Sequence, residues 1–208
     1  MREYVIAIDR EFGSGGLETG QLVAEKLGIK CYNQELLRMA AKESGLSPDL
    51  FELHDERPTN SFLYSLVMEP QSLNGYSPSR YTDVPLNHKV FMAVFDTIKK
   101  LASRESCVIV GRCADYALED YDGCVSVFIQ GKRDYKIGRL QHDFGWNPEE
   151  ARSNMKRLDK RRASYYNYFS NKKWGEAKTY DLTLESSKLK PEGCAEMIKR
   201  YLEIKRFI

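Results

Sequence analysis

The sequence predicts an α/β fold in which helices cover both faces of a five-stranded parallel sheet. Short apolar segments typical of strands alternate along the chain with amphipathic segments typical of helices. Residues 107–110 are apolar at every position, which is typical of a strand covered on both faces. The chain has 208 residues, 42% of them hydrophobic, and this is enough for one good-sized core. We therefore expect a single domain over 1–208.

The first part of the chain alternates strand and helix. Residues 4–9 are apolar up to the final aspartate and include three β-branched residues, which favours a strand, and the amphipathic segment after the glycine turn predicts a helix that ends at a glycine. Residues 29–32 predict a short second strand. Asn33 is placed to cap a helix over residues 34–44. Pro48 predicts the first turn of another short helix, because proline is favoured at that position.

A long segment without a regular pattern follows. Residues 57–87 carry four prolines among Asn, Ser and Gly, with a short apolar island at 62–68. An irregular segment of about 30 residues inside a compact domain is usually functional or mobile. We therefore expect an excursion at about 46–88 that passes over the substrate site.

The second half of the chain returns to regular alternation. Hydrophobic periodicity predicts, in order, a helix of about 16 residues around 90–101, strands over 107–110 and 124–129, a helix from 148 into 165–166, a strand over 180–184 and a helix over 191–205. Asn147, Pro148 and Glu150 form a strong helix start, since they combine a cap, a proline in the first turn and a capping-box glutamate.

The turn between the first strand and the first helix predicts a phosphate site. It reads Arg10-Glu11-Phe12-Gly13-Ser14-Gly15-Gly16-Leu17, with three glycines in four positions. Glycine permits the positive φ angles that point successive N–H groups into one concavity, and the free N–H groups of the first helical turn add partial positive charge. The alternative is an ordinary tight turn with nothing bound.

This loop departs from the standard motif Gly-x-x-x-x-Gly-Lys-Ser/Thr, in which lysine contacts the phosphates and the hydroxyl binds Mg²⁺. With Gly15 as the second motif glycine, Gly16 stands at the lysine position and Leu17 at the hydroxyl position. Arg10 stands at the first glycine. Either Arg10 substitutes for the missing charge or it pairs with Glu11.

Positive charge is concentrated in one segment. The net charge of the chain is +2, but residues 132–162 hold ten basic and five acidic residues. Such a local excess indicates a polyanion site rather than a nucleic-acid surface, with a solvated helix face as the alternative. We expect a cytoplasmic protein with no membrane partner, because the sequence shows no apolar stretch of about 20 residues and no Cys-x-x-Cys pair.

Several separated segments together resemble one family. They are residues 8–16, 24–28, 110–112, 159–169, 173–175 and 180–182. In order and spacing they resemble the cytidylate kinase-like family, a branch of the P-loop nucleoside monophosphate kinases. The resemblance implies a three-layer P-loop kinase fold with a lid region at about 132–175. It also implies transfer of a phosphoryl group from ATP, with Mg²⁺, to a nucleoside monophosphate such as CMP or dCMP.

The resemblance and the demands of phosphoryl transfer assign candidate residues. The nucleotide-binding candidates are Arg10, Phe12, Gly13, Ser14, Gly15, Gly16 and Leu17. The catalytic candidates are Arg139, Asp159, Lys160, Arg161 and Arg162, and the acceptor-binding candidates are Asn33, Arg38 and Arg112. Arginine suits this chemistry because its planar fork donates two hydrogen bonds to phosphate. A surface pair between Asp159 and Arg162 is the alternative for those two side chains.

Departures from the family pattern keep other functions open. Asn33 and Cys113 stand where cytidylate kinases have aspartates, so cytosine specificity is not implied. A nucleotide-binding sensor without turnover is favoured by the missing lysine and by Leu17, whereas the retained arginines favour a kinase. The aromatic run at 165–169 suits either base stacking or core packing. The sequence allows a homodimer but does not establish one.

Overall fold

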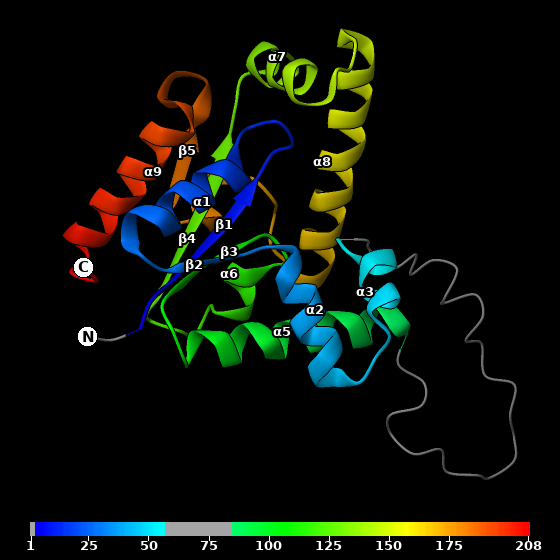
Figure 1. The fold of residues 1–208 in the computed structure, drawn as a ribbon, viewed down its shortest axis with the longest axis vertical. Helices are drawn as coiled ribbons and strands as arrows, with labels where there is room; N and C mark the ends of the chain where they lie inside the picture. Colours follow the sequence, from blue (N-terminus) through cyan, green and yellow to red (C-terminus); the bar gives the residue numbers. More distant parts are fainter. Residues whose placement is uncertain (1–2, 57–84) are drawn as a thin grey trace, which may run out of the picture.

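A five-stranded parallel sheet forms the middle layer of the computed structural model, which describes residues 3–56 and 85–208 (Figure 1). The strands are β1 (Val5–Arg10), β2 (Lys30–Tyr32), β3 (Cys107–Val110), β4 (Cys124–Gln130) and β5 (Leu182–Glu185). Their order across the sheet is β2-β3-β1-β4-β5. Because β1 is the central strand, the glycine turn that follows it opens at the middle of the sheet's carboxyl edge, where open α/β sheets bind ligands.

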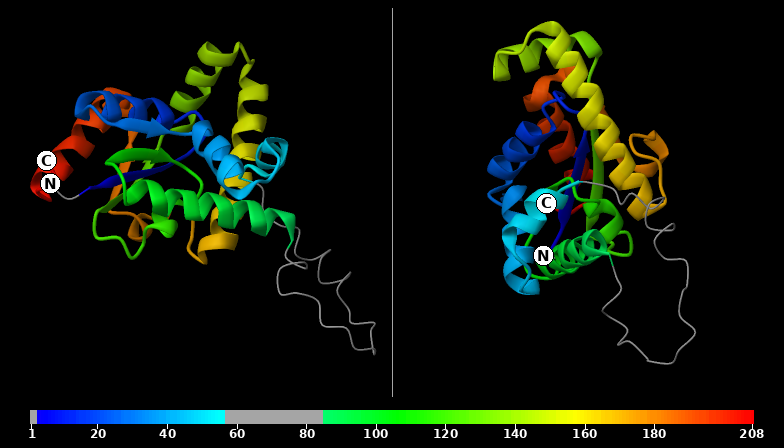
Figure 2. Two further views of the ribbon diagram at one scale, coloured as in Figure 1. Left: turned by 60° about the horizontal axis from the view of Figure 1, so that its bottom comes forward. Right: turned by 90° about the vertical axis from the view of Figure 1, so that its right-hand side faces the viewer.

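Helices cover both faces of the sheet (Figure 2). In the described part of the chain they are α1 (Gly16–Leu27), α2 (Gln34–Ser44), α3 (Pro48–His54), α5 (Leu86–Ala102), α6 (Ala114–Ala117), α7 (Arg133–Phe144), α8 (Pro148–Ser170), the 3-10 turn η1 (Ala177–Thr179) and α9 (Ser186–Ile204). Helices α1 and α9 lie against one face, and α2, α5 and α6 against the other. No helix among these combines the length and apolar character that crossing a membrane requires.

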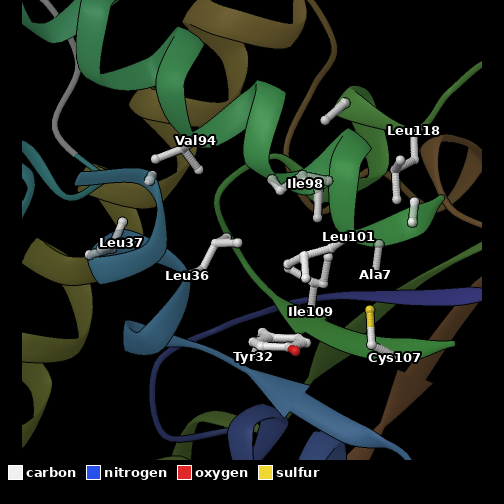
Figure 3. Packing of buried hydrophobic residues seen from close by; sticks show 14 of the residues in the cluster. Ala7, Tyr32, Leu36, Leu37, Val94, Ile98, Leu101, Cys107, Ile109 and Leu118 are labelled. Carbon is white, nitrogen blue, oxygen red and sulfur yellow. The ribbon is translucent and has the colours of Figure 1, made fainter. Parts of the chain in front are cut away.

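Alternation along β1 divides the core between the two faces. Val5 and Ala7 pack with side chains of α2 and α5, and Figure 3 shows Ala7 near Ile98 and Leu101 in that cluster. Ile6 points to the opposite face and packs with side chains of α1 and α9. Successive side chains of a strand point to opposite faces, so a continuous apolar strand needs cover on both. Full burial of an isoleucine side chain such as that of Ile6 contributes about 1.5–3 kcal/mol to the free energy of unfolding.

The sequence-based boundaries agree closely with most elements. The expected helix over 34–44 and strand over 107–110 are confirmed residue for residue. The cap of α8 is also confirmed, because the side-chain oxygen of Asn147 accepts from the amides of Glu149 and Glu150, each at 3.0 Å. Helix α7 was not expected, since its buried face is narrow in a basic segment. The expected excursion lies mostly at 57–84, outside the described residues.

The role predicted for Asn33 as a helix cap is wrong. The residue precedes α2, but its side chain makes no cap hydrogen bond. Its oxygen instead accepts from a terminal nitrogen of Arg112 at 2.7 Å. The charged guanidinium is the stronger donor, because hydrogen bonds to ionised groups exceed neutral ones in strength.

Candidate functional site

The turn from β1 into α1 has the geometry of a phosphate loop. Gly13 and Gly15 both have φ of +81°, and α1 begins at Gly16 with the free N–H groups of its first turn. Ser14 is fully buried, and its hydroxyl donates to the carbonyl of Glu11 at 2.8 Å. Ser14 therefore shapes the loop and does not present its hydroxyl to a ligand. The amides of the glycines and of the first turn remain as the anion-binding groups.

Arg10 explains why glycine stands at the lysine position. A Cβ atom added to Gly16 would lie 2.3 Å from the Cβ of Arg10 and 2.8 Å from its Cγ. A side chain at position 16 and the Arg10 side chain therefore exclude each other. A Cβ on Gly111, in the turn after β3, would likewise lie 2.6 Å from a terminal nitrogen of Arg10. At Gly16 the clash is with Arg10 atoms next to the backbone, so glycine is required there, whereas at Gly111 the close atoms are side-chain ends and the φ of +80° is what favours glycine.

The guanidinium of Arg10 pairs with Glu56 and not with Glu11. Its Nη1 lies 2.8 Å from Oε1 of Glu56. The other carboxylate oxygen of Glu56 lies 3.1 Å from Nε of Arg162. Nη1 of Arg162 donates to the backbone carbonyl of Arg10 at 3.2 Å. Glu11 instead pairs with the buried Lys136 at 2.9 Å. The alternative pairing between Arg10 and Glu11 is therefore wrong.

The carboxylate of Glu56 lies among three arginines. Burial raises its pKa, but the guanidinium groups of Arg10, Arg162 and Arg112 outweigh burial and hold the pKa well below the usual range. Burial and the nearby Arg10 charge both lower the pKa of Arg162. Glu56 is therefore ionised near neutral pH and compensates the positive charge around it.

The turn after β3 presents Arg112. Gly111, Arg112 and Cys113 have φ of +80°, +59° and +55°, a strained run of the kind that clusters at functional sites. Arg112 binds both carboxylate oxygens of Asp55, at 2.9 and 2.8 Å. It also donates to Asn33 at 2.7 Å and to the carbonyl of Val110 at 3.0 Å. Two predicted acceptor-binding residues, Asn33 and Arg112, thus bind each other.

A cavity of about 380 Å³ opens in front of the glycine turn. Its lining includes most of the predicted site residues: Arg10, Phe12, Gly13, Gly15, Gly16, Leu17, Asn33, Arg112, Arg139, Arg161 and Arg162. A second cavity of about 260 Å³ is lined by Arg38. Gln34 and Asp55 line both cavities, so the two are neighbours. Neither cavity is lined by Lys160, which is exposed.

Two arginines at the cavity keep a nitrogen without a protein partner. The Nε atoms of Arg139 and Arg161 are buried and make no hydrogen bond within the described residues. Arg139 pairs with Glu18 at 2.6 Å, and its Nη1 would lie 3.2 Å from a Cβ on Gly15. Buried polar atoms normally have partners, so these nitrogens are suited to an anionic ligand.

Asp159 anchors the glycine loop through the backbone amide of Phe12. One of its carboxylate oxygens accepts from the amide of Phe12 at 2.6 Å, and the other lies 3.8 Å from Nζ of Lys136. Burial raises the pKa of Asp159, while the Phe12 amide, Lys136 and Arg162 act in the opposite direction. The surface pair considered for Asp159 and Arg162 is wrong, because the Arg162 side chain is only 15% exposed and pairs with Glu56.

Aromatic rings join the corner between α7 and α8 to the glycine loop. The ring of Phe12 lies 6.0 Å from that of Phe144 and 6.2 Å from that of Trp146, and Arg162 lies 5.6 Å above the Phe12 ring. The aromatic run at 165–169 serves mainly packing. Its Phe169 stacks on Phe91 with centroids 3.9 Å apart.

Sequence reasoning missed the acidic side of the site. Asp55 and Glu56 follow α3 inside the expected excursion, just before its irregular part at 57–87, and Lys136 lies in the basic segment for which a solvated face was the alternative. The adjacent pair of acids before a proline-rich segment is the signal that could have found the first two. Lys136 gives no such signal, because only the packing of α7 on α8 buries it.

The residues present do not fit a directly bound Mg²⁺. Leu17 offers no ligand at the hydroxyl position, and the buried Thr19 donates its hydroxyl to the carbonyl of Gly15 at 2.9 Å. The carboxylates of Glu11 and Glu18 each bind a basic side chain, at 2.9 and 2.6 Å. Among the described residues, no group of three or more His, Cys, Asp or Glu could hold a metal ion.

Comparison with known proteins agrees with this geometry. A model of the cytidylate kinase-like family matches residues 5–188. The crystal structure of an uncharacterized protein from Eubacterium ventriosum is similar, with a TM-score of 0.70 and 29% identity over 97% of this chain and 99% of that chain. No curated protein matches the sequence significantly.

Two kinases of known structure share the fold. Shikimate kinase from Bacteroides thetaiotaomicron has a TM-score of 0.54 and 15% identity over 96% of this chain and 98% of its own. A gluconokinase from Sinorhizobium meliloti has a TM-score of 0.50 and 14% identity over 99% of this chain and 97% of its own. At these identities the likeness shows the fold alone, which is that of the P-loop kinases.

Replacing Gly16 by alanine should destabilise the protein. The added Cβ would overlap the Arg10 side chain, and such overpacking typically costs about 1–3 kcal/mol. Urea unfolding measures the change. Gly138→Ala in α7 is the matched control, since its Cβ meets nothing within 4 Å and alanine should stabilise the helix by about 0.5–1 kcal/mol. Equal effects of the two substitutions would contradict the steric argument.

Asp9 should make stability depend on pH. Burial, aided by Asp115 and Glu56 and opposed by Arg10, raises its pKa from 3.8 to about 6. The folded protein therefore keeps a proton that the unfolded chain loses, and Asp9's contribution to stability is lost as pH rises from about 4 to about 6. The free energy of unfolding of Asp9→Asn, relative to wild type, should rise over that interval and then level off. A difference that stays constant from pH 4 to 8 would show that Asp9 titrates normally.

Proposed function

The chain belongs to the cytidylate kinase-like family, and from this membership we propose that it is an ATP-dependent nucleoside monophosphate kinase acting on CMP, dCMP or a related monophosphate. One observation carries the proposal. Five arginines from four segments meet the glycine loop in one cavity: Arg10, Arg112, Arg139, and the adjacent Arg161 and Arg162. Phosphoryl transfer asks a protein mainly for positioning and for cations around the transferred group.

The donor nucleotide is held by backbone and guanidinium groups together. The amides of Gly13, Gly15 and the first turn of α1 bind the β-phosphate, because helix N-termini favour anions. Arg139 and Arg161 contact the γ-phosphoryl group and gain hydrogen bonds for their unpartnered Nε atoms. Guanidinium groups stay charged at any working pH, so they supply the positive charge that the missing lysine would carry.

The acceptor occupies the smaller cavity. Arg38 reaches it from the exposed face of α2 and binds the phosphate of the monophosphate. Gln34 and Asp55 line both cavities, so the acceptor oxygen faces the glycine loop across their side chains. Holding donor and acceptor in neighbouring cavities supplies the orientation that in-line transfer requires.

A nucleotide-binding sensor without turnover is the second candidate. It is supported by the loop itself, in which Gly16 and Leu17 provide neither the ammonium nor the hydroxyl of the standard motif. In that function the arginines bind nucleotide and report its presence, and no phosphoryl group moves.

One assay separates the two functions. The purified protein is incubated with Mg-ATP and a panel of nucleoside monophosphates, with shikimate and gluconate as acceptors of other P-loop kinases. ADP that appears only when a monophosphate is present supports the kinase. Nucleotide binding without ADP production supports the sensor, and ADP production with shikimate or gluconate alone would contradict the proposed acceptor class.

Arg161→Ala should abolish most turnover and leave the fold stable. Removing an arginine that stabilises the transferred group commonly costs about 10³-fold or more in rate. Within the described residues Arg161 makes no ion pair, whereas Arg162→Ala would also remove a partner from the buried Glu56. Lys160→Ala is the control, since that neighbouring side chain is exposed and away from both cavities. Steady-state kinetics and thermal unfolding measure both effects, and equal rates in the two variants would exclude Arg161 from catalysis.

A further inference from the structure

Two buried arginines share a single carboxylate at the cavity. Glu56 lies between Arg10 and Arg162 and gives one oxygen to each, at 2.8 and 3.1 Å. The third arginine nearby, Arg112, has its own bidentate partner in Asp55. A second buried carboxylate, that of Asp9, lies 3.6 Å from the Arg10 guanidinium, and among the described residues Glu56 is the one carboxylate that bridges Arg10 and Arg162.

The shared carboxylate stands where a ligand would reach the arginines. Glu56, Arg10 and Arg162 all line the cavity in front of the glycine turn. The side chain of Glu56 is only 5% exposed, and its backbone has φ of +48°. A non-glycine residue with positive φ is uncommon, and such strain persists where the surroundings impose it. Glu56 makes its ion pairs with Arg10 and Arg162 from this conformation.

We propose that the Glu56 carboxylate occupies a phosphoryl-binding site in the ligand-free protein, and that a phosphoryl group of the substrate displaces it from Arg10 and Arg162. The three oxygens of a phosphoryl group offer both arginines a hydrogen bond in place of the two carboxylate oxygens of Glu56. Displacement also lets Glu56 leave its strained backbone conformation. The source of the phosphoryl group, donor or acceptor, rests on the proposed kinase function, whereas the exchange itself does not.

The exchange has a measurable thermodynamic consequence. As long as Glu56 is ionised, any incoming anion has to overcome its competition for the same guanidinium groups. The three arginines keep the pKa of this carboxyl well below its usual range, so the competition persists throughout the neutral pH range. Removing the charge while keeping the shape should therefore strengthen anion binding. A purely structural ion pair predicts the opposite, because its loss would only disorder the arginines.

Glu56→Gln tests the proposal with inorganic pyrophosphate as the probe. Isothermal titration should show pyrophosphate binding at least about tenfold tighter in the variant than in the wild type, since a nearby like charge is removed. Glu105→Gln is the control, because Glu105 pairs with Lys30 at the surface. The affinity of this variant for pyrophosphate should equal that of the wild type. Unchanged or weaker binding in Glu56→Gln overturns the proposal. If that variant does not fold, Glu56→Asp is used: the shorter carboxylate cannot span both arginines, so pyrophosphate should still bind more tightly than in the wild type, and equal or weaker binding overturns the proposal.

Two further titrations identify the source of the phosphoryl group. CMP alone and a non-hydrolysable ATP analogue alone are titrated into both proteins. A gain in affinity limited to CMP assigns the site to the acceptor phosphate, and a gain limited to the analogue assigns it to the γ-phosphoryl group. A gain with pyrophosphate but with neither nucleotide supports the exchange at Glu56 and contradicts the proposed kinase function. The proposed exchange at Glu56 and the proposed kinase function can therefore be contradicted independently of each other.

Discussion

Burial of the Arg10 guanidinium at the end of the central strand is the constraint on which the rest of the site depends. An isolated buried charge is too costly to keep, so a carboxylate has to reach it. The chain supplies Glu56 from the end of α3, and that carboxylate then also engages Arg162 of α8. The Arg10 side chain removes any room for a side chain at Gly16 and ends close to Gly111. One strand residue thus couples the glycine loop to two distant helices.

The charge that a standard phosphate loop carries on one lysine is distributed here over several elements. Arg10 belongs to the central strand, Arg139 to α7, and Arg161 to α8. The backbone amides of the glycine turn keep their orientation through the φ angles of Gly13 and Gly15 and the bonds that Ser14 and Asp159 make to the loop. Helices α7 and α8 supply three of the arginines that line the cavity beside this loop. The contact of Phe12 with Phe144 and Trp146 keeps them against it.

Much of the fold was predictable because its signals are local. Glycine and proline mark the helix ends, and the apolar strands 107–110 and 124–129 differ clearly from the amphipathic helices around them. The glycine motif and the family resemblance also predicted several site residues, namely the glycine loop, Arg139, Arg161 and Arg162. Pairings across the fold were not predictable in this way. The bond from Asn33 to Arg112 joins residues 79 positions apart, and whether Asn33 caps a helix or binds an arginine depends on where β3 ends.

The contact between Arg10 and Gly16 also bears on how such a loop can change over evolutionary time. Lysine at position 16 would collide with Arg10, and loss of Arg10 alone would leave Glu56 a poorer set of partners. Each single substitution toward the standard motif should therefore destabilise the protein. Only a paired exchange at both positions restores a compatible arrangement. A lineage that has adopted this loop is thus separated by a mutational barrier from its lysine-bearing relatives.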